Sequence, residues 1–195
     1  PDHEGGRWEY AVQLQKAGKK EEALEQYEKL AENNSEKLEF HVAAGSLSLQ
    51  LGKVEKAIGP FTEALKIAPG DFDALYGLGW ALTHQGKAGE AIPYLEKAKG
   101  LKPQDPDLRK TLAKAYADSG QRDKAKAELE QAIEAGGSAD EKQRLALAAD
   151  YIKSNNLDKA KTQLSEILKK NQGNADARVL LQDLTQLGFR FVEIV

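Results

Sequence analysis

The residue types that support catalysis or metal binding are present in this sequence, but not at the spacings that such chemistry needs. The three histidines, His3, His41 and His84, lie far apart. None has a second histidine four residues away, the spacing at which one helix face offers two metal ligands. The segment Gly77–Gly79 resembles half of a phosphate-binding loop, but no strand precedes it, so its glycines are interpreted as packing contacts. No serine or cysteine occupies a nucleophile elbow. We therefore expect no enzyme, no metal site and no cofactor.

The composition excludes further classes of protein. The chain has 195 residues, 41% hydrophobic and 30% charged, and a net charge of −3, so we expect a globular protein that binds no nucleic acid and no anionic membrane. No apolar run is long enough to insert in a membrane. There is no cysteine, and therefore no disulfide, and no methionine even at the first position. We expect an excised domain or a processed form that has lost any targeting signal, which leaves the cytoplasm and a bacterial periplasm both open.

Two groups of side chains do have a spacing suited to binding. Tyr76, Trp80 and His84 follow one another at i, i+4 and i+8, so on a helix they point the same way, as anchors of a binding surface would. The alternative is that Trp80 packs against a neighbouring helix. Lys110 and Lys114 form a second i, i+4 pair, which would either receive an acidic group of a partner or remain solvated.

These side chains belong to a predicted helical hairpin, Phe72–Asp105. Gly86 stands between its two helices, where a tight turn needs a residue that tolerates positive φ, and Pro103 follows the second helix. The apolar or small residues at helical spacing are Leu75, Leu78, Gly79 and Leu82 on the first helix and Ala91, Leu95 and Ala98 on the second.

The same pattern recurs at intervals of 34 residues, with one residue inserted before the fifth copy. An alanine stands at each expected crossing of the second helix, namely Ala23, Ala57, Ala91, Ala125 and Ala160. The turn position is held by Gly18, Gly52, Gly86, Gly120 and Asn155. A period of this length predicts a solenoid of stacked hairpins.

The pattern resembles the tetratricopeptide repeat. The resemblance implies an all-α, right-handed α-solenoid whose five repeats are approximately 4–37, 38–71, 72–105, 106–139 and 141–174, in a single domain over 1–195. The departures are mild: Ser35, Gly137 and Gln172 stand where the family has its proline, and Asn155 replaces the turn glycine.

The two ends of the chain are expected to differ from the repeats. Residues Pro1–Gly6 are interpreted as a frayed leader before a first helix at Arg7–Ala17. A capping helix at 175–187 would cover the last repeat and end at Gly188. The apolar tail 188–195 is expected to be extended. It would lie either on the flank of its own cap helix or in the groove of a second molecule, giving a homo-oligomer.

The resemblance also implies a concave groove lined by the first helix of each repeat. Its expected residues are Trp8, Val12 and Lys16; Val42, Ser46 and Gln50; Tyr76, Trp80 and His84; Lys110, Lys114 and Asp118; Leu145, Ala149 and Ile152. One subclass of the family binds C-terminal carboxylates through a clamp of lysine, asparagine and arginine. The matching positions here hold Trp8, Val12, Ala43, Asp73 and Gly77, so no such clamp is expected.

The expected function is a non-enzymatic protein–protein interaction module, a scaffold or adaptor that holds a peptide or extended segment in its groove. The segment would offer an apolar or aromatic side chain to Tyr76 and Trp80 and an acidic group to Lys110 and Lys114. Bacterial family members are commonly adaptors, and this chain looks bacterial. The alternatives are a structural scaffold that self-assembles through its C-terminal tail and a regulatory repeat region of an enzyme.

Overall fold

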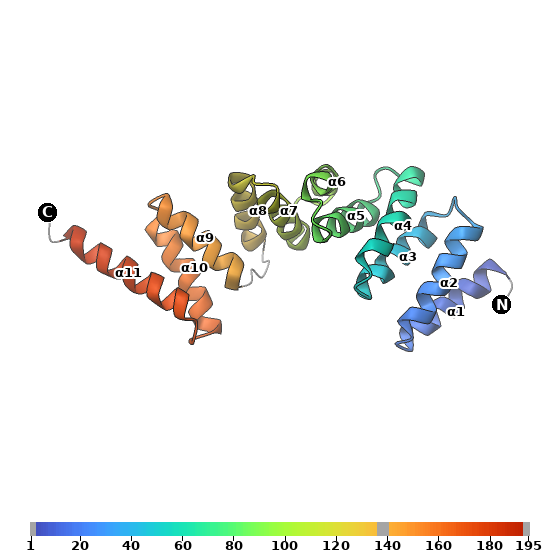
Figure 1. Ribbon diagram of the computed structural model, residues 1–195, viewed down its shortest axis with the longest axis horizontal. Helices are drawn as coiled ribbons and strands as arrows, with labels where there is room; N and C mark the ends of the chain where they lie inside the picture. Colours follow the sequence, from blue (N-terminus) through green and yellow to red (C-terminus); the bar gives the residue numbers. More distant parts are fainter. Residues whose placement is uncertain (1–2, 136–140, 193–195) are drawn as a thin grey trace. The chain divides into compact units, whose positions relative to one another are not determined.

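The computed structural model describes residues 3–135 and 141–192, with side chains up to residue 185. These residues form eleven helices and no strand, as the all-α prediction requires (Figure 1). The helices are α1 Glu4–Lys16, α2 Lys20–Asn33, α3 Leu38–Gln50, α4 Val54–Ile67, α5 Phe72–His84, α6 Ala88–Leu101, α7 Pro106–Asp118, α8 Arg122–Glu134, α9 Glu141–Lys153, α10 Leu157–Lys170 and α11 Ala175–Val192.

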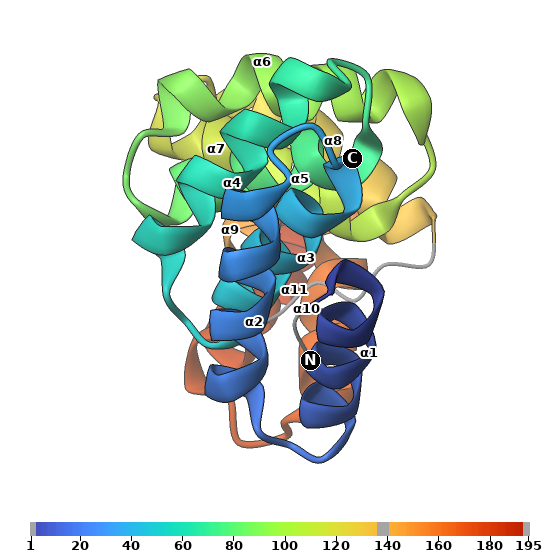
Figure 2. The same ribbon diagram turned by 90° about the vertical axis from the view of Figure 1, so that its right-hand side faces the viewer.

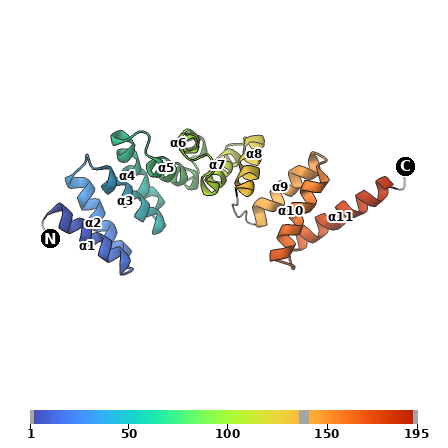
Figure 3. The ribbon, with the colours of Figure 1, turned by 180° about the vertical axis from the view of Figure 1, so that it is seen from behind.

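The chain divides into two compact units, Pro1–Ala135 and Gly136–Val195. In unit 1, α1 to α8 form four hairpins, and each hairpin packs against the next. Figure 2 shows α1 beside α2, the first of these pairs. In unit 2, α9 pairs with α10, and α11 packs on α10 (Figure 3). The single domain over 1–195 stays a prediction.

The turns inside the hairpins confirm the role of the predicted turn residues. The backbone φ is positive at Gly18, Gly52, Gly86 and Gly120, between 70° and 82°, and is 55° at Asn155. After α5, the Lys87 N–H donates to the Leu82 carbonyl at 2.9 Å, and the Gly86 N–H donates to the Thr83 carbonyl at 3.2 Å. This is the Schellman arrangement, in which a residue in the left-handed region lets the last carbonyls of a helix find donors.

Small residues allow neighbouring helices to approach closely, both within a hairpin, as the sequence predicts, and between hairpins. Ala57 and Ala91 are fully buried at their crossings. A Cβ at Gly79 would lie 2.6 Å from the Leu95 side chain, and a Cβ at Gly77 would lie 2.3 Å from the Phe61 ring. Both distances are too short for a carbon contact, so the interpretation of Gly77–Gly79 as packing glycines is confirmed.

The expected leader Pro1–Gly6 is wrong from Glu4 onward, where α1 already begins. The Arg7 N–H donates to the His3 carbonyl at 3.0 Å, which closes the first turn. Glu4 lies in that turn, where the helix dipole favours a carboxylate, and it is paired with Lys37. These contacts offset the cost of the two glycines that follow, at most ~1 kcal/mol each.

The expected extended tail is wrong over residues 188–192, because α11 continues through Gly188 to Val192. A glycine ends a helix only when its backbone takes the left-handed conformation, whereas inside a helix it costs only ~1 kcal/mol relative to alanine. The β-branched and aromatic residues that follow are weaker helix formers by a similarly small amount. Residues 193–195 of the predicted tail lie outside the described part of the chain.

Side chains at the fourth position of every repeat except the third, and at the same position of α11, form a set of bonds that the sequence did not predict. In α7, Arg109 donates from Nη1 to the Glu128 carboxylate at 2.5 Å and from Nε to the Pro103 carbonyl at 2.8 Å. The bond to the second helix recurs as Arg7 to Gln26 at 3.3 Å and Arg144 to Gln163 at 2.7 Å. The bond to the carbonyl six residues earlier recurs from His41 to Ser35 at 3.0 Å and from Arg178 to Gln172 at 2.5 Å. These bonds attach a first helix to its own second helix and to the loop before it.

Candidate functional site

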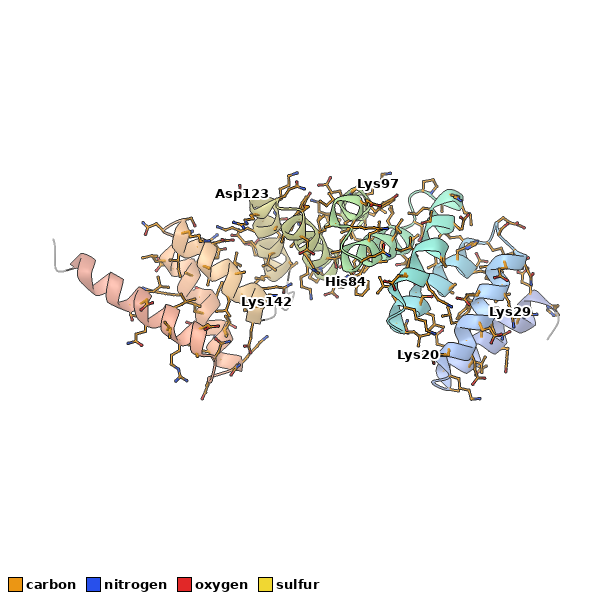
Figure 4. The ribbon with its side chains drawn as sticks, viewed as in Figure 1. Lys20, Lys29, His84, Lys97, Asp123 and Lys142 are labelled. Carbon is orange, nitrogen blue, oxygen red and sulfur yellow. The ribbon has the colours of Figure 1, made fainter. Side chains whose placement is uncertain are left out.

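The first helices of unit 1 form a common face, because α3 contacts α5 and α5 contacts α7 directly. The predicted groove residues occur at equivalent places on these helices. Val42, Tyr76 and Lys110 hold one position, and Ser46, Trp80 and Lys114 hold the position one turn later. All of these side chains are half-buried except Lys114, which is exposed. Figure 4 shows His84 on the lower side of unit 1, with Lys97 and Asp123 on its upper side.

A hollow of about 230 Å³ lies between α3 and α5 on this face. It contains three of the predicted groove residues, Ser46, Tyr76 and Trp80. The lining also contains four residues that were not predicted as groove residues: Leu49, Phe61, Asp73 and Gly77. The hollow is therefore narrower than the groove that the sequence predicts and is centred on α5.

The floor of the hollow is made by a side chain from a second helix. Phe61 of α4 is 1% exposed, and its ring lies against the backbones of α3 and α5. It fits because Gly45 and Gly77 have no side chains: a Cβ would come within 2.9 Å of the ring at Gly45 and within 2.3 Å at Gly77. Phe61 holds in the second repeat the position that Leu95 holds in the third, but nothing in the repeat pattern indicated that its ring underlies the groove.

Two aromatic side chains of α5 form the wall. Tyr76 stacks on Phe72 with ring centroids 6.0 Å apart, and its hydroxyl lies 3.4 Å from Thr111 Oγ1 of α7. Burial raises the pKa of Tyr76, against the opposing effect of the Thr111 hydroxyl, so the phenol is neutral at physiological pH.

Trp80 continues the same wall toward the end of α5. It stacks on His84, with ring centroids 3.6 Å apart and planes 18° from parallel. The His84 Nδ1 lies 2.8 Å from the Trp80 carbonyl, which holds the imidazole over the indole. The predicted stripe of Tyr76, Trp80 and His84 thus contains two stacked pairs, Phe72 with Tyr76 and Trp80 with His84, and His84 lies at its exposed end.

The charged groups of this face are unevenly distributed. Asp73 is the one charged residue among the described residues that line the hollow. Lys110 is paired with Asp107 at 2.7 Å and Lys114 with Asp118 at 2.6 Å, all four on α7. The interpretation that these lysines receive an acidic group from a partner stays a prediction, and each already has a carboxylate beside it.

Comparison with known families identifies the repeats. Three sequence profiles described as "Tetratricopeptide repeat" match residues 11–72, 61–92 and 82–149, which together span most of the chain. The chain belongs to the tetratricopeptide repeat family. Members of this family are protein-interaction scaffolds, so the coarse part of the functional prediction is supported. None of the curated proteins compared matches the chain.

Solved structures of other tetratricopeptide repeat (TPR) proteins share the fold. MamA 41-end from Desulfovibrio magneticus RS-1 aligns with a TM-score of 0.75 at 20% identity, over 90% of this chain and 98% of that one. YrrB, described as a TPR protein with an unusual peptide-binding site, aligns at 0.71 and 23% identity, over 88% of each chain. TTC0263, a thermophilic TPR protein of Thermus thermophilus, aligns at 0.56 and 26% identity, over 94% of this chain and all of that one.

The remaining predicted groove residues of this TPR chain do not join the hollow. Trp8 contacts Tyr27 and Phe40, with ring centroids 5.2 and 5.4 Å apart, and Val12 packs against the same cluster. Val42 packs against the core of the central repeats. Leu145 and Ala149 are half-buried on α9 in unit 2. The repeat position that faces the groove therefore holds packing residues in the first repeat and binding candidates in the third.

Metal clusters and membrane-spanning helices are missing from the described part of the chain. Residues 3–135 and 141–192 contain no group of three or more histidine, cysteine or acidic residues placed to hold a metal ion. Within the same ranges, no helix combines the length and the hydropathy needed to cross a bilayer. The hollow between α3 and α5 is thus the candidate site that the structure and the predicted residues have in common.

Proposed function

We propose that unit 1 binds an extended segment of a partner protein and takes one apolar or aromatic side chain of that segment into the hollow between α3 and α5. The observation that carries the proposal is the hollow itself, with Tyr76 and Trp80 as its wall and Phe61 as its floor. A groove with an aromatic wall is the kind of surface on which a few side chains supply most of the binding energy.

The size of the hollow favours a single side chain over a small molecule. Sites for small molecules usually enclose ~300–1,000 Å³, and this hollow is smaller, about 230 Å³. An apolar cavity of ~150 Å³ is large enough for a benzene ring. A phenylalanine, tyrosine or leucine side chain therefore fits, while the rest of its chain lies outside along the face of the first helices.

A solved structure of similar fold also supports a peptide ligand. YrrB, whose fold is similar, has a peptide-binding site by its own description. The groove residues Lys110 and Lys114 on α7 would lie beside the continuation of such a segment.

Display of random peptides on the full chain tests the proposal. Peptides selected on the wild-type protein are expected to lose at least ~2 kcal/mol of binding free energy on the variant Trp80→Ala, the loss typical of a hot-spot aromatic. Tyr10→Ala is the matched control, because Tyr10 is 45% exposed on α1, away from the hollow. Helical circular dichroism and an unchanged melting transition show that Trp80→Ala is folded.

Two results would contradict the proposal. One is a selection that yields no peptide. The other is a set of peptides that bind Trp80→Ala and Tyr10→Ala equally well.

A further inference from the structure

We infer that the hollow selects a segment with a basic side chain, best an arginine, two residues from the apolar side chain that enters it. This inference rests on the proposed function and adds the charge of the partner. Lys110 and Lys114 led us to expect an acidic group on the partner, whereas this inference requires a basic one. The reason is that the carboxylate at the hollow is the group that the structure leaves available.

The position of Asp73 carries the inference. Asp73 is exposed, lines the hollow together with Tyr76 and Trp80, and forms no ion pair in the part of the chain that the structure describes. It precedes Gly77 by four residues, which places the two residues ~6 Å apart along the axis of α5. Alternate side chains of an extended chain are ~6.6 Å apart and point to the same side. A segment that runs along α5 with its apolar side chain above Gly77 therefore brings its next inward side chain to Asp73.

The surrounding charges favour a cation at that point. Glu39 holds on α3 the position that Asp73 holds on α5, and it is also exposed and outside any ion pair in the described ranges. The lysines of α7 add no net charge, because Lys110 and Lys114 are balanced by Asp107 and Asp118 of the same helix. Asp73 is thus the charge that lines the hollow, whereas Glu39 interacts electrostatically with Lys37 and the fourth repeat presents paired charges.

Arginine fits this place better than lysine. Its planar guanidinium donates two parallel hydrogen bonds to one carboxylate and also stacks on aromatic rings. Asp73 offers the carboxylate, and Tyr76, one turn further along α5, offers the ring. An ammonium group would pair with Asp73 alone, as a hydrated point charge.

Three short fluorescent peptides test the inference on the full chain. Each has a phenylalanine in a neutral glycine and serine background, and they differ only two residues from the phenylalanine, where they have arginine, glutamine or glutamate. We expect the arginine peptide to bind about tenfold tighter than the glutamate peptide, since an exposed ion pair and the corresponding repulsion each change affinity several-fold. We expect added salt to reduce that ratio.

Two variants test whether the preference for arginine comes from the charge of Asp73 in particular. Asp73→Asn is expected to reduce the ratio of the two affinities to less than about threefold, because one full charge is lost beside the hollow. Asp123→Asn is the matched control: Asp123 is also an exposed aspartate in the first turn of a helix, but it lies on the upper side of unit 1, opposite His84 (Figure 4). The ratio of the two peptide affinities in Asp123→Asn is expected to equal that of the wild-type protein.

The outcomes distinguish this inference from the proposed function. Equal affinity for the arginine and glutamate peptides, or an unchanged ratio in Asp73→Asn, overturns the inference. If those peptides still lose affinity in Trp80→Ala, the proposed groove stands without a charge preference. If Trp80→Ala binds the arginine peptide as well as the wild-type protein does, both the groove and its charge preference are overturned.

Discussion

Arg109 and Glu128 form a buried ion pair between the two helices of the fourth repeat, with 2.5 Å between Nη1 and Oε2. Lys99 of the preceding repeat reaches the other carboxylate oxygen at 2.7 Å. The pair thus connects α7 and α8 with each other and with α6. In the third repeat, Leu75 and Tyr94 hold the two equivalent positions, so this fold also tolerates uncharged side chains there.

The variant Glu128→Ala is expected to lower the free energy of unfolding by about 3–5 kcal/mol, because it leaves the Arg109 guanidinium buried without a carboxylate. The double variant Arg109→Leu with Glu128→Leu is expected to cost less than Glu128→Ala alone, since no buried charge remains. Urea unfolding of the three proteins measures both quantities. A double variant less stable than Glu128→Ala would show that the ion pair itself stabilises this repeat.

Stability is expected to fall in alkaline solution because of three tyrosines. Burial raises the pKa of Tyr116, and its hydrogen bond to Glu96 raises that pKa further. Burial also raises the pKa values of Tyr27 and Tyr76. Above the ordinary phenol pKa of ~10, the folded state keeps protons that the unfolded state has released. The free energy of unfolding therefore keeps its full value below pH ~10. It falls as the pH rises above that value through the pKa values that these tyrosines have in the folded state.

Urea unfolding at a series of pH values checks the alkaline prediction. The variant Tyr116→Phe is expected to flatten the fall, because one of the three phenols with a raised pKa is gone. A stability curve with the same slope in Tyr116→Phe as in the wild-type protein would assign the alkaline loss to other groups.

Two glycine-to-alanine variants separate the effect of a steric clash from the effect of backbone flexibility in a helix. Gly77→Ala places a Cβ 2.3 Å from the Phe61 ring and is expected to destabilise the protein by about 1–3 kcal/mol and to disturb the floor of the hollow. Gly100→Ala, in the last turn of α6, meets nothing within 4 Å and is expected to stabilise by about 0.5–1 kcal/mol. Thermal melting gives the sign of each change. Because the expected signs are opposite, each variant serves as the control for the other.

The turn residues give a prediction about backbone handedness alone. A Cβ at Gly86 would meet nothing within 4 Å, so Gly86→Ala costs only the strain of a side chain at φ 82°, about 1–2 kcal/mol. Asn155 already occupies the same conformation with φ 55°, so Asn155→Gly is expected to be neutral or slightly stabilising. A stabilising Gly86→Ala in chemical unfolding would contradict this account.

The repeat pattern predicted most of the fold because each signal acts locally. Turn glycines and crossing alanines fix where a hairpin turns and where its helices cross, and both were correct at positions such as Gly86 and Ala91. The two ends were less well predicted. A glycine stops a helix only through its conformation, and Gly188 lies inside α11 instead of ending it, while α1 begins before Gly6.

The candidate site was predicted only in part. Tyr76 and Trp80 were found from their spacing, because residues four apart share a helix face. The hollow was not, since it depends on how the Phe61 ring passes between Gly45 and Gly77 of two other helices. The bonds of Arg109 had a visible signal, the recurrence of arginine at Arg7, Arg144 and Arg178 at the repeat period. A repeated charged residue inside an apolar pattern is therefore a sign of a recurring structural bond.

The bonds that join different helices span short stretches of sequence. Arg109 and Glu128 are 19 residues apart, Lys99 and Glu128 are 29 apart, and Tyr76 and Thr111 are 35 apart. Contacts between residues close in the sequence form quickly. A ribosome adds ~5–20 residues per second, whereas helices form in about a microsecond. Each hairpin of unit 1 therefore has seconds in which to fold on its predecessor before the next hairpin is synthesised, so the order of the repeats in the gene is also the order in which their packing surfaces are covered.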